Sequence, residues 1–391
     1  MTSTGRNVAL LAACQAMLFS NSSTMASING LAGMALTTNP AIGTLPVTTW
    51  VLGGAIATLP ASMYMKRVGR TQGLIAGAST GIVAALICAL AIGLHNFWLL
   101  CLGTLVFGAS NATGQYYRFA AADVSPYDYK ARAISLVLAG GLVGGILGPG
   151  ASRFSVDAFG ERFLGAYLFL IVFSLITIAL LKATRIPDPT AAEQASGGRP
   201  LLEIARQPKF VVAVLAGAIG YGVMNLLMTA TPIAMNLCGH PFGDAAFVVS
   251  SHVIAMFAPS LVAGSLIKRF GVLNIILAGA ALNAACIAVA LGGVDVAHFW
   301  WSLVLLGVGW NFMYIGGTTL LTETYRPQEK AKAQGTNDMC IFVMMVLSSL
   351  TSGLLVTSAG WDRVNLLAIP LLVVVAVAAL WLSFRREPAP G

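Results

Sequence analysis

The chain has 391 residues, of which 57% are hydrophobic and only 9% are charged, and its mean hydropathy is +0.83. Soluble globular domains carry about a quarter charged residues, so this composition excludes a water-soluble protein and indicates one embedded in a lipid bilayer. The net charge of +8 does not indicate nucleic-acid binding, because the lysines and arginines stand in short clusters between apolar runs.

Apolar runs separated by turn residues or charged clusters follow one another along the whole chain. A helix needs roughly 20 such residues to cross the hydrocarbon layer of a bilayer. The first run is preceded by Arg6 and has no Ala-x-Ala-type cleavage site, so we expect a membrane helix and not a removable signal. We predict an all-α membrane protein with twelve transmembrane helices at 8–36, 42–65, 72–94, 97–121, 132–152, 162–182, 209–236, 245–267, 272–292, 298–322, 333–357 and 363–384.

The longest polar interval divides these helices six and six, and it contains several prolines and glycines. We therefore expect two six-helix bundles, at 1–183 and 209–391, joined by a linker at 184–208.

Basic landmarks recur in the two halves in the same order. The sequence Lys-Arg-Val-Gly at 66–69 is matched by Lys-Arg-Phe-Gly at 268–271, and Lys-Ala-Arg-Ala at 130–133 by Lys-Ala-Lys-Ala at 330–333. A duplication with a period of about 200 residues explains this order, so we expect the two bundles to be pseudo-symmetric.

The positive charges also predict an orientation. If both termini are cytoplasmic, all of the 22 lysines and arginines lie in cytoplasmic segments except Arg118, Arg153, Arg162 and Arg363. Cytoplasmic loops of membrane proteins carry an excess of these residues. We therefore expect both termini on the cytoplasmic side.

Sulfur and imidazole side chains stand at helical spacing in two successive predicted helices. Met224 and Met228 are one turn apart in the seventh helix, and His252 and Met256 are one turn apart in the eighth. Thioether and imidazole groups suit Cu(I), whereas hard cations prefer oxygen. The pattern favours a copper site in the membrane, with helix packing as the alternative because methionine commonly fills apolar cores.

Three further residues lie near the outer end of the seventh helix. Met235, Cys238 and His240 could pass a soft metal ion inward. The alternative is that Cys238 is an inert buried thiol.

Four charged residues stand inside or beside predicted helices: Arg118 and Asp123 in the first half, and Glu323 and Asp338 in the second. An ionisable group within the membrane needs a partner. We expect these four to form a cytoplasmic gate that closes by ion pairing. The alternative is that Arg118 recognises an anionic substrate.

The stretch Lys-Arg-Val-Gly-Arg at 66–70 resembles the basic loop between helices 2 and 3 of the major facilitator superfamily. Ser62 and Lys66 replace the Gly and Asp of that motif, so the charge relay attached to the Asp does not carry over. The glycine-rich run from Gly140 to Gly150 resembles the family's Gly-Pro motif of antiporters, although we favour close helix packing as its role. The resemblance implies a secondary transporter with the major facilitator fold.

The pairs Met224/Met228 and His252/Met256 within such a chain resemble the CcoA-type bacterial copper importers. This resemblance implies copper as the transported substrate, with no cofactor, and a supply of copper to the assembly of cbb₃-type cytochrome c oxidase. It also implies the bacterial cytoplasmic membrane and a cytoplasmic copper chaperone as a partner. We expect a monomer in the lipid bilayer.

Two alternatives stay open. An organic-solute carrier would resemble riboflavin transporters, with Tyr116, Tyr117, Trp310 and Tyr314 stacking on a flat ring. A drug or metabolite exporter would agree with the Gly-Pro pattern. The sequence has no nucleotide-binding loop and no hydrolase motif, so we expect a transporter and not an enzyme.

Overall fold

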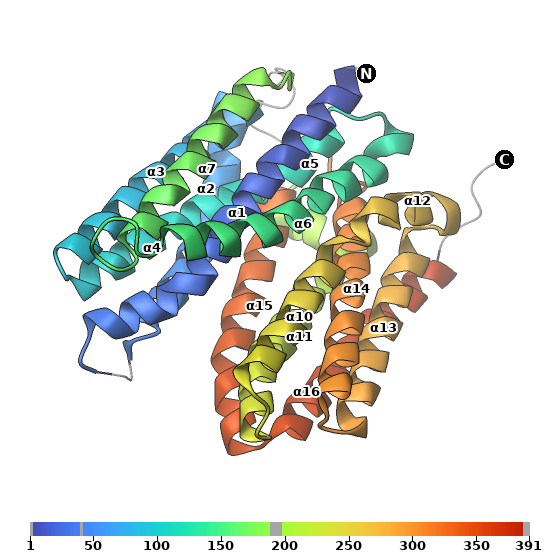
Figure 1. The fold of residues 1–391 in the computed structure, drawn as a ribbon. Coiled ribbons are helices and arrows are strands. Elements are labelled where there is room, and N and C mark those ends of the chain that lie inside the picture. Colours follow the sequence, from blue (N-terminus) through green and yellow to red (C-terminus); the bar gives the residue numbers. More distant parts are fainter. Residues whose placement is uncertain (1–2, 40–41, 188–197, 386–391) are drawn as a thin grey trace. The chain divides into compact units, whose positions relative to one another are not determined.

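The computed structural model describes residues 3–39, 42–187 and 198–385, and within these ranges all regular secondary structure is helical (Figure 1). The helices of the first half are α1 (Ser3–Leu36), α2 (Leu45–Val68), α3 (Arg70–Gly93), α4 (Phe97–Gly114), α5 (Tyr117–Asp123), η2 (Tyr127–Tyr129), α6 (Lys130–Ser155) and α7 (Leu164–Ala183). Those of the second half are α9 (Leu201–Ala205), α10 (Pro208–Leu237), α11 (Phe242–Phe257), α12 (Ser260–Phe270), α13 (Val272–Gly292), α14 (Val296–Leu321), η3 (Pro327–Glu329), α15 (Lys330–Ser358) and α16 (Trp361–Phe384).

The described residues contain eleven helical spans that are long and apolar enough to cross a membrane, and twelve if the bent pair α11 and α12 counts as one. This confirms the predicted all-α class of membrane protein. The eighth predicted helix, 245–267, is the bent pair, with an angle of 43° between its two parts. Pro259 stands at the break, and a proline has no N–H for the helical hydrogen bond and clashes with the preceding turn.

The chain divides into two compact units. Unit 1 comprises residues 1–198 and 327–342, and unit 2 comprises residues 199–326 and 343–391. Helix α15 is continuous, yet its first three turns group with unit 1 and the remainder with unit 2. The bundles predicted at 1–183 and 209–391 assigned the whole of this helix to the second half, because a polar interval marks a linker but does not show which helices pack together.

Within unit 1, α1 and α6 pack closely through the glycine-rich run. A Cβ atom on Gly140, Gly144 or Gly148 would lie closer than 3 Å to atoms of α1, whereas one on Gly150 would meet nothing. The three glycines are four residues apart and share one face of α6. Small residues let two helix backbones approach in a membrane, and this close packing is the role that the sequence favoured for the run.

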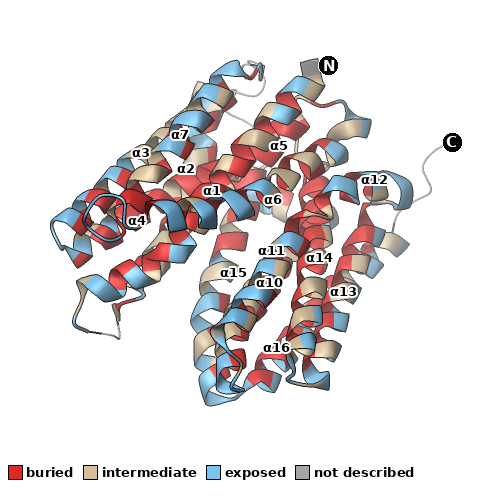
Figure 2. Cartoon of the chain, viewed as in Figure 1, coloured by how far each residue is buried: buried red, intermediate tan, exposed pale blue. Residues whose placement is uncertain are grey.

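Within unit 2, α14 packs against α10, α11 and α13, and more than three quarters of its most apolar stretch is buried. Figure 2 shows exposed residues along the outward sides of the helices of each unit. Many of the exposed side chains are large and apolar, such as Leu86, Trp98, Ile146 and Val377. A soluble protein rarely exposes so much apolar surface, whereas a lipid-facing surface is expected to be apolar.

Candidate functional site

The residues predicted to bind copper lie on two helices of unit 2. Met224 and Met228 are on α10, the first buried and the second half-buried, while His252 and Met256 on α11 are both buried. The ring atom Nδ1 of His252 lies 2.7 Å from the carbonyl oxygen of Leu303 in α14, and a carbonyl only accepts, so Nδ1 donates.

The same face of α11 is held against α14 one turn further on, where Asn311 Nδ2 donates to the carbonyl oxygen of Met256 at 2.6 Å. Helices α10 and α11 do contact each other. No group of three or more His, Cys, Asp and Glu side chains within the described part of the chain is placed to hold a metal ion. The hydrogen bonds at His252 and at the carbonyl group of Met256 join α11 to α14, as in helix packing.

The proposed relay residues lie at the end of α10. Met235 is buried, and Cys238 is a free, exposed cysteine, not the buried thiol of the alternative. His240 is half-buried, with Nε2 2.7 Å from the carbonyl oxygen of Val294 and its ring against Phe299 at 5.9 Å. These contacts give His240 a role in holding the connection after α10 against α14, and a relay of metal stays a prediction.

Arg118 and Asp338 form a buried ion pair in unit 1. Arg118 Nη2 lies 2.5 Å from Asp338 Oδ1, and the side chains are 1% and 2% exposed. Arg118 lies in α5 and also donates through Nη1 to the carbonyl oxygen of Gln115 at 2.9 Å. Its guanidinium stacks over the ring of Phe119 at 4.4 Å. Asp338 lies in the part of α15 that belongs to unit 1, which is why these two predicted gate residues meet.

Asp123, at the end of α5, forms ion pairs with two positively charged side chains. Its Oδ2 accepts from Arg70 Nε at 3.1 Å, and its Oδ1 lies 3.2 Å from Lys330 Nζ. Arg70 also donates through Nη2 to Gln334 Oε1.

Three side chains of α15 thus meet charged residues of unit 1 in successive turns. Lys330 meets Asp123, Gln334 meets Arg70 and Asp338 meets Arg118, so we call Lys330, Gln334 and Asp338 the polar ladder. Residues four apart lie above one another on a helix face. The sequence analysis did not identify Arg70, Lys330 and Gln334 as partners. The spacing of 330, 334 and 338 could have indicated that these three side chains share one helix face.

Glu323, the fourth predicted gate residue, belongs to unit 2. Its Oε2 lies 2.8 Å from Nζ of Lys209, at the start of α10. The predicted set of four is therefore split between the two units, three in unit 1 and one in unit 2. The gating role of these charges stays a prediction.

Four aromatic rings cluster in unit 2. Trp310 and Tyr314 of α14 stack with ring centroids 5.1 Å apart and planes at 16°. Tyr221 of α10 meets both edge-on, at 5.2 Å and 5.3 Å, and Phe257 of α11 meets Trp310 at 5.7 Å. We call Tyr221, Phe257, Trp310 and Tyr314 the aromatic cluster.

The stacking set suggested by the sequence is divided by the fold. Trp310 and Tyr314 are together, but Tyr116 and Tyr117 are buried in unit 1, where the hydroxyl of Tyr116 donates to the carbonyl oxygen of Thr58 at 2.9 Å. Tyr221 and Phe257 were missed, since nothing in the spacing along one helix tells which rings of other helices will meet it.

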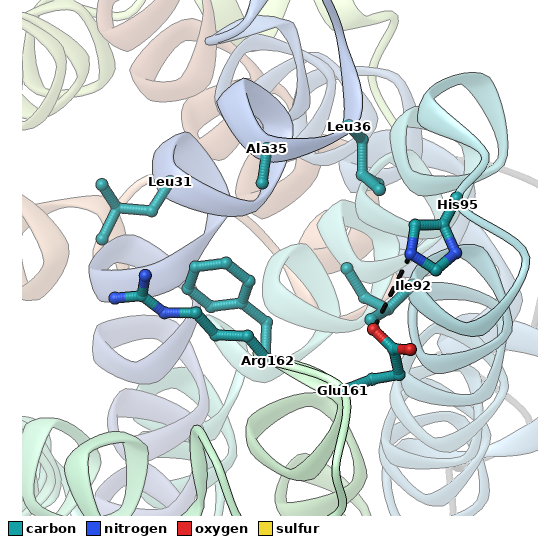
Figure 3. A pocket seen from close by; sticks show the side chains of 8 residues that line it. Leu31, Ala35, Leu36, Ile92, His95, Glu161 and Arg162 are labelled. Carbon is teal, nitrogen blue, oxygen red and sulfur yellow. Dashed lines mark ion pairs between the residues drawn. The ribbon is translucent and has the colours of Figure 1, made fainter.

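Unit 1 also has a small pocket that the sequence did not indicate, at the ends of α1 and α3 and in the connection between α6 and α7 (Figure 3). His95 Nε2 lies 3.7 Å from Glu161 Oε2 across it. His95 and Phe163 line the pocket with positive φ angles of 51° and 75°, which are uncommon for residues other than glycine. Its lining consists of Leu31, Ala35, Leu36, Ile92, His95, Glu161, Arg162 and Phe163.

Comparison with known proteins finds a relative that aligns over nearly the whole chain. It is the riboflavin transporter RfnT of Brucella anthropi, 42% identical over 99% of this chain and 97% of its own length. The uncharacterized MFS-type transporter YddS of Bacillus subtilis is 27% identical over 88% of this chain and 82% of its own length.

This full-length similarity contradicts copper import. The relative at 42% identity is described as a transporter of riboflavin and not of copper, so the prediction of a copper importer that supplies cytochrome oxidase assembly is wrong. A metal-binding role of Met224/Met228 and His252/Met256 stays a prediction, and methionines one turn apart serve packing as well as metal binding.

Solved structures share the fold. The transporter FucP in its outward conformation superposes with a TM-score of 0.81 at 16% identity, covering 99% of this chain and all of that one. A bacterial homologue of the iron transporter ferroportin gives 0.73 at 12% identity. The family model for the Major Facilitator Superfamily matches residues 8–249 and 214–391, which together span almost the entire sequence. The chain belongs to the major facilitator superfamily of membrane transporters.

Proposed function

We propose that this protein carries riboflavin, or a flavin closely related to it, across the bacterial cytoplasmic membrane. The observation that carries the proposal is the 42% identity with the Brucella anthropi riboflavin transporter over nearly the full length of both chains. Because the alignment extends along nearly the whole chain, it includes the helices that bind the solute, whichever helices these are.

The aromatic cluster supports a flat, aromatic solute. Riboflavin carries a planar ring system, and planar rings pair well with aromatic side chains in stacked or edge-on geometry. Of the four rings, Tyr221 is half-buried, whereas Phe257, Trp310 and Tyr314 are buried. A flavin ring would therefore approach from the side of Tyr221 and lie against the stacked pair.

A polar atom in the cluster adds a directed contact. The indole Nε1 of Trp310 is buried and has no hydrogen-bond partner among the described residues. Such a donor costs free energy unless it is satisfied. A carbonyl oxygen of the flavin ring would accept from it, which an apolar aromatic solute could not do.

The orientation with both termini in the cytoplasm is part of the proposal. It is supported by the distribution of lysine and arginine between alternate loops. Ion pairs such as Lys209 with Glu323 and Arg70 with Asp123 then lie toward the cytoplasmic ends of their helices.

The test is uptake of radiolabelled riboflavin by a bacterial strain that neither makes nor imports the vitamin. Expression of this chain is expected to restore both growth on low riboflavin and uptake that excess unlabelled riboflavin inhibits. The same cells should show unchanged copper content.

A variant with Met224→Leu and Met228→Leu should import riboflavin normally, because this exchange conserves volume. No uptake above the empty-vector strain, at normal abundance in the membrane, would refute the proposal. Release of preloaded riboflavin without uptake would identify an exporter instead.

A further inference from the structure

The half-buried side of α10 carries a polar residue beside the aromatic cluster. Tyr221, which belongs to the cluster, is half-buried, and so is Asn225, four residues further along the same helix. Residues four apart lie above one another on one helix face. A flat ring that approaches the cluster from the side of Tyr221 therefore comes within reach of the Asn225 side chain.

Two hydrogen bonds hold the amide group of Asn225 against α15. Its Nδ2 lies 3.2 Å from the carbonyl oxygen of Met345 and 2.9 Å from Oγ of Ser348. A carbonyl only accepts, so the atom at Met345 is the amide nitrogen, and this determines the orientation of the amide. All three residues belong to unit 2. The amide oxygen Oδ1 has no hydrogen-bond partner among the described residues.

Helix packing explains the bonds of the amide nitrogen of Asn225 but gives its oxygen no partner. Asn283, Asn311 and Asn365 of unit 2 also have a side-chain oxygen without a partner in the described part of the chain, but these residues are 0% exposed, so no solute reaches them. Asn225 differs because it is half-buried. Lipid hydrocarbon offers no donor to a carbonyl group, so we expect this oxygen to meet water or a solute that donates a hydrogen bond.

The ring system of a flavin has one donor for such an oxygen. Its carbonyl groups and unsubstituted ring nitrogens accept hydrogen bonds, whereas the N–H of its imide group, at ring position 3, donates. Trp310 Nε1 is the complementary case, a buried donor with no partner among the described residues. Unit 2 therefore has a donor within the aromatic cluster and an acceptor one turn away from it, and the imide edge of a flavin has groups that match both.

We propose that Asn225 is the residue that recognises the flavin imide, with Oδ1 accepting from the imide N–H. The proposal rests on the proposed function, because it takes riboflavin or a related flavin as the solute. Met345 and Ser348 act as positioning residues, since their bonds to Nδ2 keep the nitrogen of the amide away from the imide N–H. The site thereby selects a solute that donates a hydrogen bond at this position.

The test is the binding of flavins to the purified protein in detergent, measured as the quenching of flavin fluorescence by the aromatic side chains. Riboflavin is compared with 3-methylriboflavin, in which a methyl group replaces the imide hydrogen. For the wild type we expect the Kd of the methyl analogue to be roughly tenfold higher than that of riboflavin, because the Asn225 oxygen loses its donor. Equal Kd values for the two flavins would overturn the proposal.

Two variants assign this difference to Asn225. In Asn225→Ala the Kd of riboflavin should rise about tenfold, to that of the analogue, so that the two flavins bind equally. Asn225→Gln keeps an amide group and should retain part of the difference. The proposal is wrong if Asn225→Ala keeps the wild-type ratio of the two Kd values. It is also wrong if the ratio falls only because the analogue binds more tightly, since that result shows a steric effect of the methyl group.

The matched control is Asn365→Ala in α16. Asn365 is another asparagine of unit 2 whose Nδ2 donates to a backbone carbonyl, that of Trp361 at 3.0 Å, but it is 0% exposed. This variant should keep the wild-type ratio of the two Kd values. Should Asn225→Ala not fold, the wild-type ratio and that of Asn225→Gln decide.

The possible failures are distinguishable. If the wild type binds neither flavin, the proposed function is wrong and the role of Asn225 falls with it. If the wild type binds riboflavin but Asn225→Ala keeps the ratio, only the role of Asn225 is wrong. Lumiflavin, which lacks the hydroxylated chain but keeps the imide N–H, provides a further check. If Asn225→Ala no longer distinguished riboflavin from lumiflavin but still rejected 3-methylriboflavin, Asn225 would bind the hydroxylated chain and not the imide.

Discussion

Trp310 has the two properties that the proposed flavin site would use, a ring stacked on that of Tyr314 and a buried N–H with no partner among the described residues. The planes of the two rings lie at 16° to each other. Removing an aromatic ring on which a heterocycle stacks costs about 1–3 kcal/mol. We expect Trp310→Ala to raise the KM for riboflavin uptake roughly tenfold or more, measured as initial rates at equal amounts of protein in the membrane.

Two variants sharpen this expectation. Trp310→Phe keeps a ring but removes the donor, so its effect should be smaller than that of alanine. Trp301→Ala on the same helix is the control, because Trp301 is 53% exposed on the outer surface of unit 2 and should leave uptake unchanged. Equal effects of Trp301→Ala and Trp310→Ala would show that the aromatic cluster is not part of the riboflavin-binding site.

The methionine and histidine residues illustrate how much a pattern at this scale determines. His252 and Met256 share a face of α11, as their spacing predicted. The hydrogen bonds of this face are with α14: His252 bonds to Leu303, and the carbonyl group of Met256 bonds to Asn311. A spacing of four residues determines which side chains lie together on a helix. It does not determine what lies opposite them.

At the scale of elements, the contact of α1 with α6 depends on the absence of side chains on one face. A Cβ atom on Gly144 would lie 2.5–2.8 Å from Ala16 O, Phe19 Cβ and Ser20 N. Overpacking of this kind costs about 1–3 kcal/mol. We therefore expect Gly144→Ala to lower the melting temperature of the purified protein in detergent by several degrees.

The control for this contact is Gly150→Ala in the same helix, where a Cβ would meet nothing within 4 Å. Alanine favours the helix over glycine, so this variant should be as stable as the wild type or slightly more so. If Gly144→Ala proved equally harmless, the glycine-rich run would need another explanation, and the exporter motif would regain weight.

At the scale of the whole molecule, one native cysteine can report the orientation in the membrane. Cys238, after α10, is exposed, whereas Cys14, Cys88, Cys101 and Cys286 are buried and Cys340 is half-buried. With the termini in the cytoplasm, an odd number of spans ends at Cys238, which places it outside. We expect a membrane-impermeant maleimide to label intact cells through this residue.

Cys238→Ser should abolish that labelling and leave riboflavin uptake in place. Labelling of the wild type that appears only after the membrane is permeabilised would reverse the orientation inferred from lysine and arginine.

The sequence by itself determined what depends on local composition and period. Apolar runs of sufficient length predicted an all-helical membrane protein, and the basic stretch at 66–70 indicated the superfamily that the comparisons then established. Pro259 could also have predicted the break between α11 and α12, because the effect of a proline on its own helix is local.

Only the tertiary structure decided which helix faces meet. The fold pairs Asp338 with Arg118, which lies 220 residues earlier in the chain, and it pairs Glu323 with Lys209. It also brought the first three turns of α15 into unit 1. Helical period determines which residues share a face, but where the described residues alone hold eleven or twelve apolar spans, nearly every face is a plausible partner for every other. The choice among them depends on the packing of all the helices at once, which no local pattern records.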